Sequence, residues 1–323
     1  MSGDNDGFSS FEYRPLSGGH DVFHPPYALY PFESHWLDID GIRMHYLDEG
    51  PRNAPVVLMV HGNPTWSFYY RHLVLALRDR YRCIVPDHIG CGLSDKPGST
   101  RYPYTLERRI SDLGALMDQL QPETPINLVV HDWGGMIGFG WAVDHHEQIA
   151  SMVIANTAAF PMPSEKKLPA ALWLVRNTKL GAFLVQGLNA FSGLAARVAF
   201  KKPVSAEVRK AYTGPYDSWD NRIATLRFVQ DIPLSPNDPG YDILSSTESQ
   251  LRNFSENPCL LAWGEKDFVF DMPFLNKWKR VFPQAEVLSY PDCGHYIFED
   301  AGQPLTQAVS DFLDKNEIGH GHD

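Results

Sequence analysis

The segment NLVVHDWGGMIG places Asp132 between a buried strand that ends at Val130 and a glycine-rich helix that starts after Trp133. A strand-to-helix turn this tight pushes one side chain above the carboxyl edge of a sheet, and it needs small neighbours, which Gly134 and Gly135 provide. The pattern resembles the nucleophile elbow G-x-S-x-G, with Val130 in place of the first glycine and Asp132 in place of serine. A lone aspartate here would more often cap the following helix, so the assignment depends on partners elsewhere in the chain.

An aspartate at this position predicts a different reaction from a serine. Serine forms acyl-enzymes, whereas a carboxylate is a weak nucleophile toward carbonyls but a workable one toward an sp3 carbon that bears a leaving group. The product is an ester of the enzyme. Hydrolysis of that ester at the aspartyl carbonyl requires a base and an oxyanion site.

The base and its orienting acid are expected later in the chain. His295, in SYPDCGHYIFED, follows a strand and precedes the last helix, and Asp267, in LLAWGEKDFVFD, lies shortly after a strand end. Nucleophile, acid and histidine then follow in the chain order of hydrolases that carry this elbow. We expect His295 to polarise a water and Asp267 to hold its tautomer. Three other carboxylates compete with Asp267 on sequence alone: Glu265, Asp271 and Asp292.

A possible oxyanion site follows another buried strand, in VLMVHGNPTWSFYYRH. The backbone N–H groups of Asn63 and Trp133 are expected to point at the ester oxygen. The side chains of the same two residues add an amide N–H and an indole N–H. Two such donors in an apolar pocket suit a departing halide or a developing carboxylate, although Trp133 could instead be a core residue and Asn63 a turn residue. Asp87 and Asp95, in VPDHIGCGLSDKP, are expected to tie loops together.

The elements that position these residues alternate along the chain. WLDIDGIRMHYLDEG predicts a hairpin around Asp40-Gly41, and Thr105 is expected to cap a helix. Apolar runs predict strands, and helical spacing predicts the segments between them. The expected strands are 56–60, 82–86, 126–130, 152–156, 259–263 and 285–290, and the expected helices are 105–120, 134–146, 273–282 and 303–315. This alternation predicts a mostly parallel sheet with right-handed crossovers.

The alternation stops for about a hundred residues, which predicts an inserted domain. We expect a main domain over 31–156 and 258–316, a helical cap over 157–257 and a flexible N-terminal arm over 1–30. Residues 168–200 are apolar on more helix faces than one contact can bury. They therefore predict an apolar tunnel under the cap that accepts long alkyl chains.

Composition excludes several function classes. The chain of 323 residues has 28 Lys+Arg and 39 Asp+Glu, a formal net charge of −11. It shows no basic stripe of the kind that binds nucleic acid, and its acidic balance disfavours charge-driven binding to an anionic membrane. No apolar run reaches the ~18 residues of a spanning helix, and residues 1–24 lack the pattern of a secretory signal. A cytoplasmic location is therefore expected.

The sequence predicts no metal site. The four cysteines have no metal-ligand spacing and are expected to be free thiols in a reducing compartment: Cys83, Cys91, Cys259 and Cys293. His320 and His322 could bind a metal, but two histidines on a loose tail rarely do. The expected reaction needs neither metal nor cofactor.

Five motifs together resemble a haloalkane dehalogenase of the α/β-hydrolase superfamily: HGNPTW, PDHIGCGLSDKP, VVHDWGGMIG, the GEKD loop and DCGHY. The resemblance covers about residues 30–315. It implies an α/β-hydrolase fold, a mostly parallel eight-stranded sheet flanked by helices with an inserted helical cap. It also implies Asp132 as nucleophile, His295 as base, and Asn63 with Trp133 as the pair that holds the halide.

The acid distinguishes subfamilies within this resemblance. One subfamily carries a glutamate after the sixth strand, where this chain has VIANTAAFP, with Asn156 and no carboxylate. The acid therefore falls to Asp267. The combination of Asp, His and Asp with Asn and Trp resembles the third dehalogenase subfamily.

Two other activities share these site residues or part of them. The segments TAAFPMP, NAFSG and PYDSWDNRIATLRFVQDIPLSP are similar to the β-lactone decarboxylases that make long-chain cis-olefins in bacteria. Epoxide hydrolases also show HDWGG, and they use two cap tyrosines, for which this chain offers Tyr212, Tyr216 and Tyr241.

We expect dehalogenation through an alkyl-enzyme ester as the activity, with β-lactone decarboxylation as the alternative and epoxide hydrolysis third. A catalytically silent receptor should have lost a member of the triad, and none is missing. The expected partner is a small apolar substrate, a haloalkane or β-lactone. The resemblance leaves open a homo-oligomer or an association with hydrocarbon-synthesis enzymes.

Overall fold

The computed structural model describes residues 23–317. The expected N-terminal arm lies outside the described residues as far as residue 22, and so do His320 and His322. None of the helices in the described range is long and apolar enough to cross a membrane.

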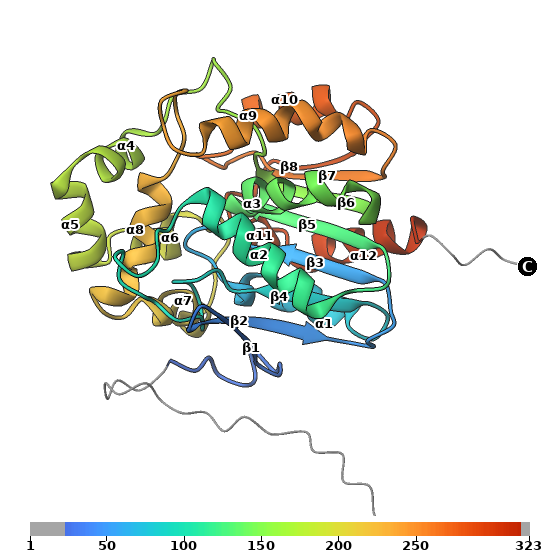
Figure 1. Cartoon of the computed structure of the whole chain (residues 1–323), viewed down its shortest axis with the longest axis horizontal. Coiled ribbons are helices and arrows are strands. Elements are labelled where there is room, and N and C mark those ends of the chain that lie inside the picture. The colour runs from blue at the N-terminus through green and yellow to red at the C-terminus, as the bar shows by residue number, and fades with distance from the viewer. Residues whose placement is uncertain (1–22, 318–323) are drawn as a thin grey trace, which may run out of the picture.

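Eight strands form one sheet in the order β1-β2-β4-β3-β5-β6-β7-β8 (Figure 1). The pairs β1–β2 and β2–β4 are antiparallel and the other neighbours are parallel, which confirms the expected mostly parallel eight-stranded sheet. The strands are β1 (His35–Ile39), β2 (Ile42–Glu49), β3 (Val56–Val60), β4 (Arg82–Pro86), β5 (Ile126–Asp132), β6 (Ile149–Thr157), β7 (Cys259–Gly264) and β8 (Glu286–Tyr290).

The first two strands form the predicted hairpin. Asp40 and Gly41 join them with φ values of 55° and 75°. A two-residue turn of type I′ requires positive φ at both positions, and Asp-Gly is among the pairs that adopt it most readily.

Helices cover both faces of the sheet (Figure 1). On β3, alternate residues enter two separate hydrophobic clusters, with Leu58 in one and Val57 and Met59 in the other. The first cluster includes residues of α2 (Leu106–Leu120), α3 (Trp133–Ala142) and α10 (Met272–Val281). The second includes residues of α1 (Arg71–Leu77), α11 (Ile297–Asp300) and α12 (Gln303–Lys315). A strand buried on both faces is apolar at every position, which explains the continuous apolar runs in the sequence.

The chain between β6 and β7 is helical. It contains α4 (Ala170–Asn177), α5 (Lys179–Leu188), α6 (Ser192–Val198), α7 (Ala206–Thr213), α8 (Ile223–Gln230) and α9 (Tyr241–Gln250). In Figure 1, α4, α5 and α6 gather at one end of the molecule, while α9 lies beside α10. The parallel strands end near the first group, so residues that follow β3, β5 and β7 meet there.

Candidate active site

Asp132 occupies a strained turn between β5 and α3. Its φ of 52° and ψ of −125° are rare for a residue with a side chain and cost roughly 1–3 kcal/mol. Two glycines permit this geometry, because a Cβ on Gly62 would collide with the Asp132 carboxylate and one on Gly134 would collide with the Val60 carbonyl. The turn directs the Asp132 carboxylate into a cavity instead of along the helix, and its side chain makes no capping bond to α3.

The two oxygens of Asp132 have different surroundings. The backbone N–H of Asn63 donates to Oδ1 across 2.6 Å. Oδ2 lies 3.6 Å from Nε2 of His295. Burial raises the pKa of Asp132, although His295 and the backbone N–H groups of Asn63 and Trp133 act in the opposite direction. One oxygen is thus held by the main chain, and the other is oriented toward the base.

His295 is held by Asp267. Its Nδ1 lies 2.8 Å from Oδ2 of Asp267, and Oδ1 of the same carboxylate accepts the backbone N–H of Val269 across 2.7 Å. Burial lowers the pKa of His295, but the carboxylates of Asp267 and Asp132 outweigh it and leave that pKa raised. The structure therefore brings together the three residues that the sequence predicted as nucleophile, acid and base.

The three competing carboxylates point elsewhere. Glu265 accepts a hydrogen bond from the Ser289 hydroxyl at the surface. Asp271 pairs with Lys166 across 2.6 Å, and Asp292 is 81% exposed beside a lysine. Among these four residues only Asp267 reaches His295.

Asn63 and Trp133 both line the cavity above Asp132. The indole N–H of Trp133 has no hydrogen-bond partner in residues 23–317, so it is free to donate to a ligand. The amide of Asn63 is partly engaged, because Nδ2 donates to the Thr225 carbonyl across 3.1 Å while its Oδ1 is buried without a partner. Only the second hydrogen of that amide remains for a ligand, so the two side-chain donors named from the sequence are not equally available.

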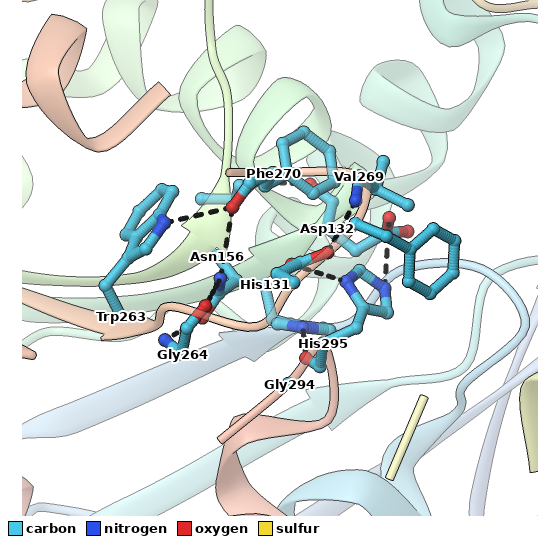
Figure 2. Close-up of polar contacts among 12 residues, drawn as sticks. His131, Asp132, Asn156, Trp263, Gly264, Val269, Phe270, Gly294 and His295 are labelled. Carbon is cyan, nitrogen blue, oxygen red and sulfur yellow. Dashed lines mark hydrogen bonds and ion pairs between the residues drawn. The ribbon is translucent and has the colours of Figure 1, made fainter. Parts of the chain in front are cut away.

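Three further residues, which the sequence motifs did not reveal, hold the loops that carry His295 and Asp267: His131, Asn156 and Asp300. His131 donates from Nε2 to the carbonyl of His295 across 2.7 Å. Asn156, which the sequence analysis used only as a missing carboxylate, donates to the carbonyls of Gly264 and Phe270 (Figure 2). It thereby joins β6 to both ends of the loop that carries Asp267.

Asp300 fixes the loop of His295 from the other side. Its carboxylate accepts the backbone N–H of Gly294 across 2.7 Å and those of Lys201 and Lys202 across 2.8 and 2.9 Å. The residues after α6 and the loop that carries His295 therefore share one buried anchor. No long-range contact of this kind is visible in the local sequence pattern.

A cavity of about 350 Å³ extends from the triad toward the helices between β6 and β7. Asp132 and His295 lie on its polar floor. Its walls are predominantly apolar, and residues from three of those helices line them: Ala171, Leu172, Leu174, Val175, Leu184, Val185, Leu194, Ala195 and Val198. The size and character are those of a site for a small apolar molecule.

The tyrosines required by the epoxide-hydrolase alternative do not line this cavity. The hydroxyl of Tyr212 donates to Glu299, and that of Tyr216 lies 3.4 Å from the Thr65 carbonyl. Tyr241 begins α9. Among the residues that the structure describes, no pair of tyrosines is therefore placed to polarise an epoxide over Asp132.

The loop aspartates have the structural role predicted for them. Asp87 accepts the backbone N–H groups of Ser67 and Leu93, and Asp95 accepts that of Arg43. All four cysteines are free and buried. Within residues 23–317 no three His, Cys, Asp or Glu side chains are grouped to hold a metal.

Comparisons with known proteins agree with this architecture. The model of the alpha/beta hydrolase fold family matches residues 55–302. A solved structure with the same arrangement is the haloalkane dehalogenase DatA from Agrobacterium tumefaciens. It has a TM-score of 0.80 and 23% identity, and the likeness covers 91% of this chain and all of that one. At this identity the structural likeness concerns the fold.

Curated relatives of two different names are similar to this chain. A cis-3-alkyl-4-alkyloxetan-2-one decarboxylase from Shewanella oneidensis is 53% identical over 90% of this chain and 91% of its own length. One of the same name from Xanthomonas campestris is 49% identical over 90% and 99%. Haloalkane dehalogenase 2 from Mycobacterium bovis is 31% identical over 89% and 97%. The decarboxylases are thus more similar than the dehalogenase, which reverses the order in which the sequence analysis ranked the two activities.

Proposed function

This chain belongs to the α/β hydrolase fold family, and we propose that within it the protein is a decarboxylase of β-lactones with alkyl chains at C3 and C4. The observation that carries the proposal is the position of the Asp132 carboxylate on the floor of an apolar cavity of about 350 Å³. The names of the two relatives at 53% and 49% identity support it. The proposed roles are Asp132 as nucleophile, His295 with Asp267 as its partner, and Asn63 with Trp133 as anion-stabilising donors.

The proposed first step is displacement at C4 of the lactone. Oδ2 of Asp132 forms a bond to C4 while the bond from C4 to the ring oxygen breaks, and the ring oxygen becomes part of a free carboxylate. The strain of the four-membered ring favours this opening. The unpartnered indole N–H of Trp133 and the second amide hydrogen of Asn63 are the donors available to the new carboxylate.

The second step releases carbon dioxide. The bond between C3 and the carboxylate breaks, its electron pair forms the C3=C4 double bond, and the bond from C4 to Asp132 breaks to restore the aspartate. Atoms and charge balance without water. His295, when protonated, lies 3.6 Å from the oxygen that departs and stabilises its returning charge.

The stereochemistry of these steps is consistent. Attack from behind inverts C4 and places the aspartyl oxygen anti to the carboxylate on C3. Anti elimination from that arrangement converts a cis-substituted lactone into a cis-alkene. Ester hydrolysis would instead produce a β-hydroxy acid, so the identity of the product distinguishes the two routes.

Haloalkane dehalogenation is the second candidate. The free indole N–H of Trp133 favours it, because a halide leaving an alkyl carbon near Asp132 would need such a donor. In that reaction His295 would act as base toward a water that hydrolyses the alkyl ester. The relatives with this name stand at 31% identity.

A parallel assay tests the proposal. The purified protein is incubated with a cis-dialkyl β-lactone and, separately, with a 1-bromoalkane of matching chain length. We expect the lactone to give alkene and carbon dioxide with the larger specificity constant, measured by gas chromatography and by halide release. Asp132→Asn should abolish both reactions. Formation of β-hydroxy acid without alkene, or turnover of the bromoalkane alone, would reject the proposal.

A further inference from the structure

Large apolar side chains that remain exposed gather on the helices between β6 and β7. Of the thirteen such side chains in residues 23–317, seven lie between Trp173 and Trp219. Scattered exposed apolar residues are ordinary, but a group of them marks an interaction surface. We call this group the outer helical face: Trp173, Leu180, Phe183, Leu188, Leu194, Val198 and Trp219. Its helices α4 and α5 lie at the extreme end of the molecule in Figure 1.

The same part of the chain is basic. Residues 157–213 carry nine Lys or Arg against two Asp or Glu, a formal charge of +7. Two of these cations, Lys166 and Arg176, pair with Asp271 and Asp238 from outside this range. Lys179 and Arg197 are exposed, and within the described chain neither has a carboxylate at ion-pair distance. Asp217 and Asp220 flank the face at one edge. The negative net charge of the whole chain, which disfavours binding to an anionic surface, therefore does not describe this basic region.

Basic and apolar residues share the same exposed helical turns. On α5, Lys179 precedes Leu180 and lies one turn before Phe183, and on α6, Arg197 lies one turn after Leu194. Helices that lie in a membrane interface combine residues in this way. Their apolar side chains enter the headgroup region while lysine and arginine reach lipid phosphates.

The cavity reaches the surface at this face. Leu194 lines the cavity although 52% of it is exposed, and Phe268, on the loop after β7, lines it with 45% exposed. The opening therefore lies between α6 and the β7–α10 loop. The apolar interior of a lipid layer held against the outer helical face would be continuous with the apolar walls of the cavity. An acidic surface of another protein in the same place would not be.

We propose that the outer helical face binds an anionic lipid surface and that the apolar substrate passes from that surface into the cavity between α6 and Phe268. The path of the substrate rests on the proposed function, because a dialkyl β-lactone partitions into lipid. The binding of the surface does not depend on the reaction.

Vesicle binding by the full chain tests this proposal. We compare phosphatidylcholine vesicles with vesicles that also contain phosphatidylglycerol, at low and high salt. Lys179→Gln with Arg197→Gln removes two cations and should weaken binding to the anionic vesicles about 30-fold. Leu180→Ser with Phe183→Ser should weaken it as well. The matched control is Arg252→Gln with Lys279→Gln, which removes one exposed arginine and one exposed lysine outside the outer helical face, from residues 251–254 and from α10.

The supporting result is salt-sensitive binding to the anionic vesicles that both face variants lose and the control keeps, with all variants equally active on a short, water-soluble β-lactone. Absence of binding by the wild type, or equal binding by every variant, would overturn the proposal. A wild-type oligomer that Leu180→Ser with Phe183→Ser converts to monomers, without vesicle binding, would assign the face to a second copy of the chain. Vesicle binding without lactone turnover would reject the proposed function but would still support the binding of the outer helical face to lipid.

Discussion

His131 donates a hydrogen bond from Nε2 to the backbone carbonyl of His295 across 2.7 Å, although 164 residues separate the two in the chain. Because Nε2 carries the proton, Nδ1 of His131 keeps a lone pair, and that buried atom has no partner. Burial holds the pKa of His131 well below its usual value, so the ring stays neutral. The residue before Asp132 thus fixes the main chain of the base.

His131→Phe should therefore lower kcat and leave KM nearly unchanged. The lost hydrogen bond contributes about 0.5–1.5 kcal/mol, which corresponds to roughly a tenfold slower reaction if it acts only on the position of His295. The control is His145→Phe, which removes a histidine–carbonyl bond of 2.8 Å beyond the end of α3. Steady-state kinetics measure kcat and KM of both variants. An equal decrease of kcat in the two would assign His131 a purely structural role.

Removal of the His295 imidazole should trap an intermediate in either reaction. His295→Phe should accumulate an alkyl ester on Asp132 from a bromoalkane and a β-carboxyalkyl ester from a lactone, whereas Asp132→Asn should form neither. Mass spectrometry of the digested protein locates the adduct. Modification of any residue other than Asp132 would contradict the assignment of the nucleophile.

Asp267→Asn should fold normally and lose activity by about 10³–10⁴-fold, because the histidine loses both its tautomer and its stabilising charge. Glu265→Gln is the matched control, since that carboxylate contacts only Ser289 at the surface. Circular dichroism checks folding and single-turnover kinetics measure the loss. If Asp267→Asn were fully active and Glu265→Gln inactive, the assignment of Asp267 as the acid would be wrong.

The two candidate reactions should respond to pH in opposite directions. The pKa of His295 is raised above 6.5. Hydrolysis of an alkyl ester needs neutral His295, so bromoalkane turnover should rise as pH increases through that pKa, whereas lactone turnover should fall because it uses the imidazolium. Asp267→Asn should shift both limbs to lower pH. If both turnover rates rose with pH, or both fell, His295 would have the same role in the two reactions.

Protonation of His295 also contributes to folding stability. Because its folded-state pKa is raised, the stabilisation is fully present below the unfolded value of about 6.5 and is lost as pH increases through the folded value. Thermal unfolding across this range should show the loss in the wild type and a smaller one in Asp267→Asn.

Chain length should control specificity. Each added CH₂ that enters the cavity contributes about 0.8 kcal/mol, or roughly fourfold in kcat/KM, up to at least about eight carbons. Leu184→Trp should move the optimum to shorter chains because Leu184 lines the cavity, while Phe183→Trp, at the neighbouring exposed position, should not. Assays with a series of lactones and bromoalkanes check this, and an optimum at two or three carbons would contradict it.

The sequence predicted the parts of the site that depend on local pattern. Strand ends and glycines located Asp132, and chain order located His295. The choice of Asp267 over Glu265 rests on which of two side chains in one short loop points inward, and the structure is needed to see this. His131, Asn156 and Asp300 escaped detection because their bonds reach across the fold to backbone atoms, which leave no signature in residue types. The net charge of −11 likewise averaged over the basic stretch 157–213, which a count by segment would have shown.

The Asp300 carboxylate connects the segment beside the cavity opening to the loop of the catalytic histidine. The carboxylate holds Gly294, next to the base, and Lys201, just beyond the helix that borders the opening of the cavity. The position of that helix and the position of the catalytic histidine therefore depend on the same carboxylate. The opening of the cavity and the alignment of the reacting groups are thus built on a common support instead of on separate parts of the fold.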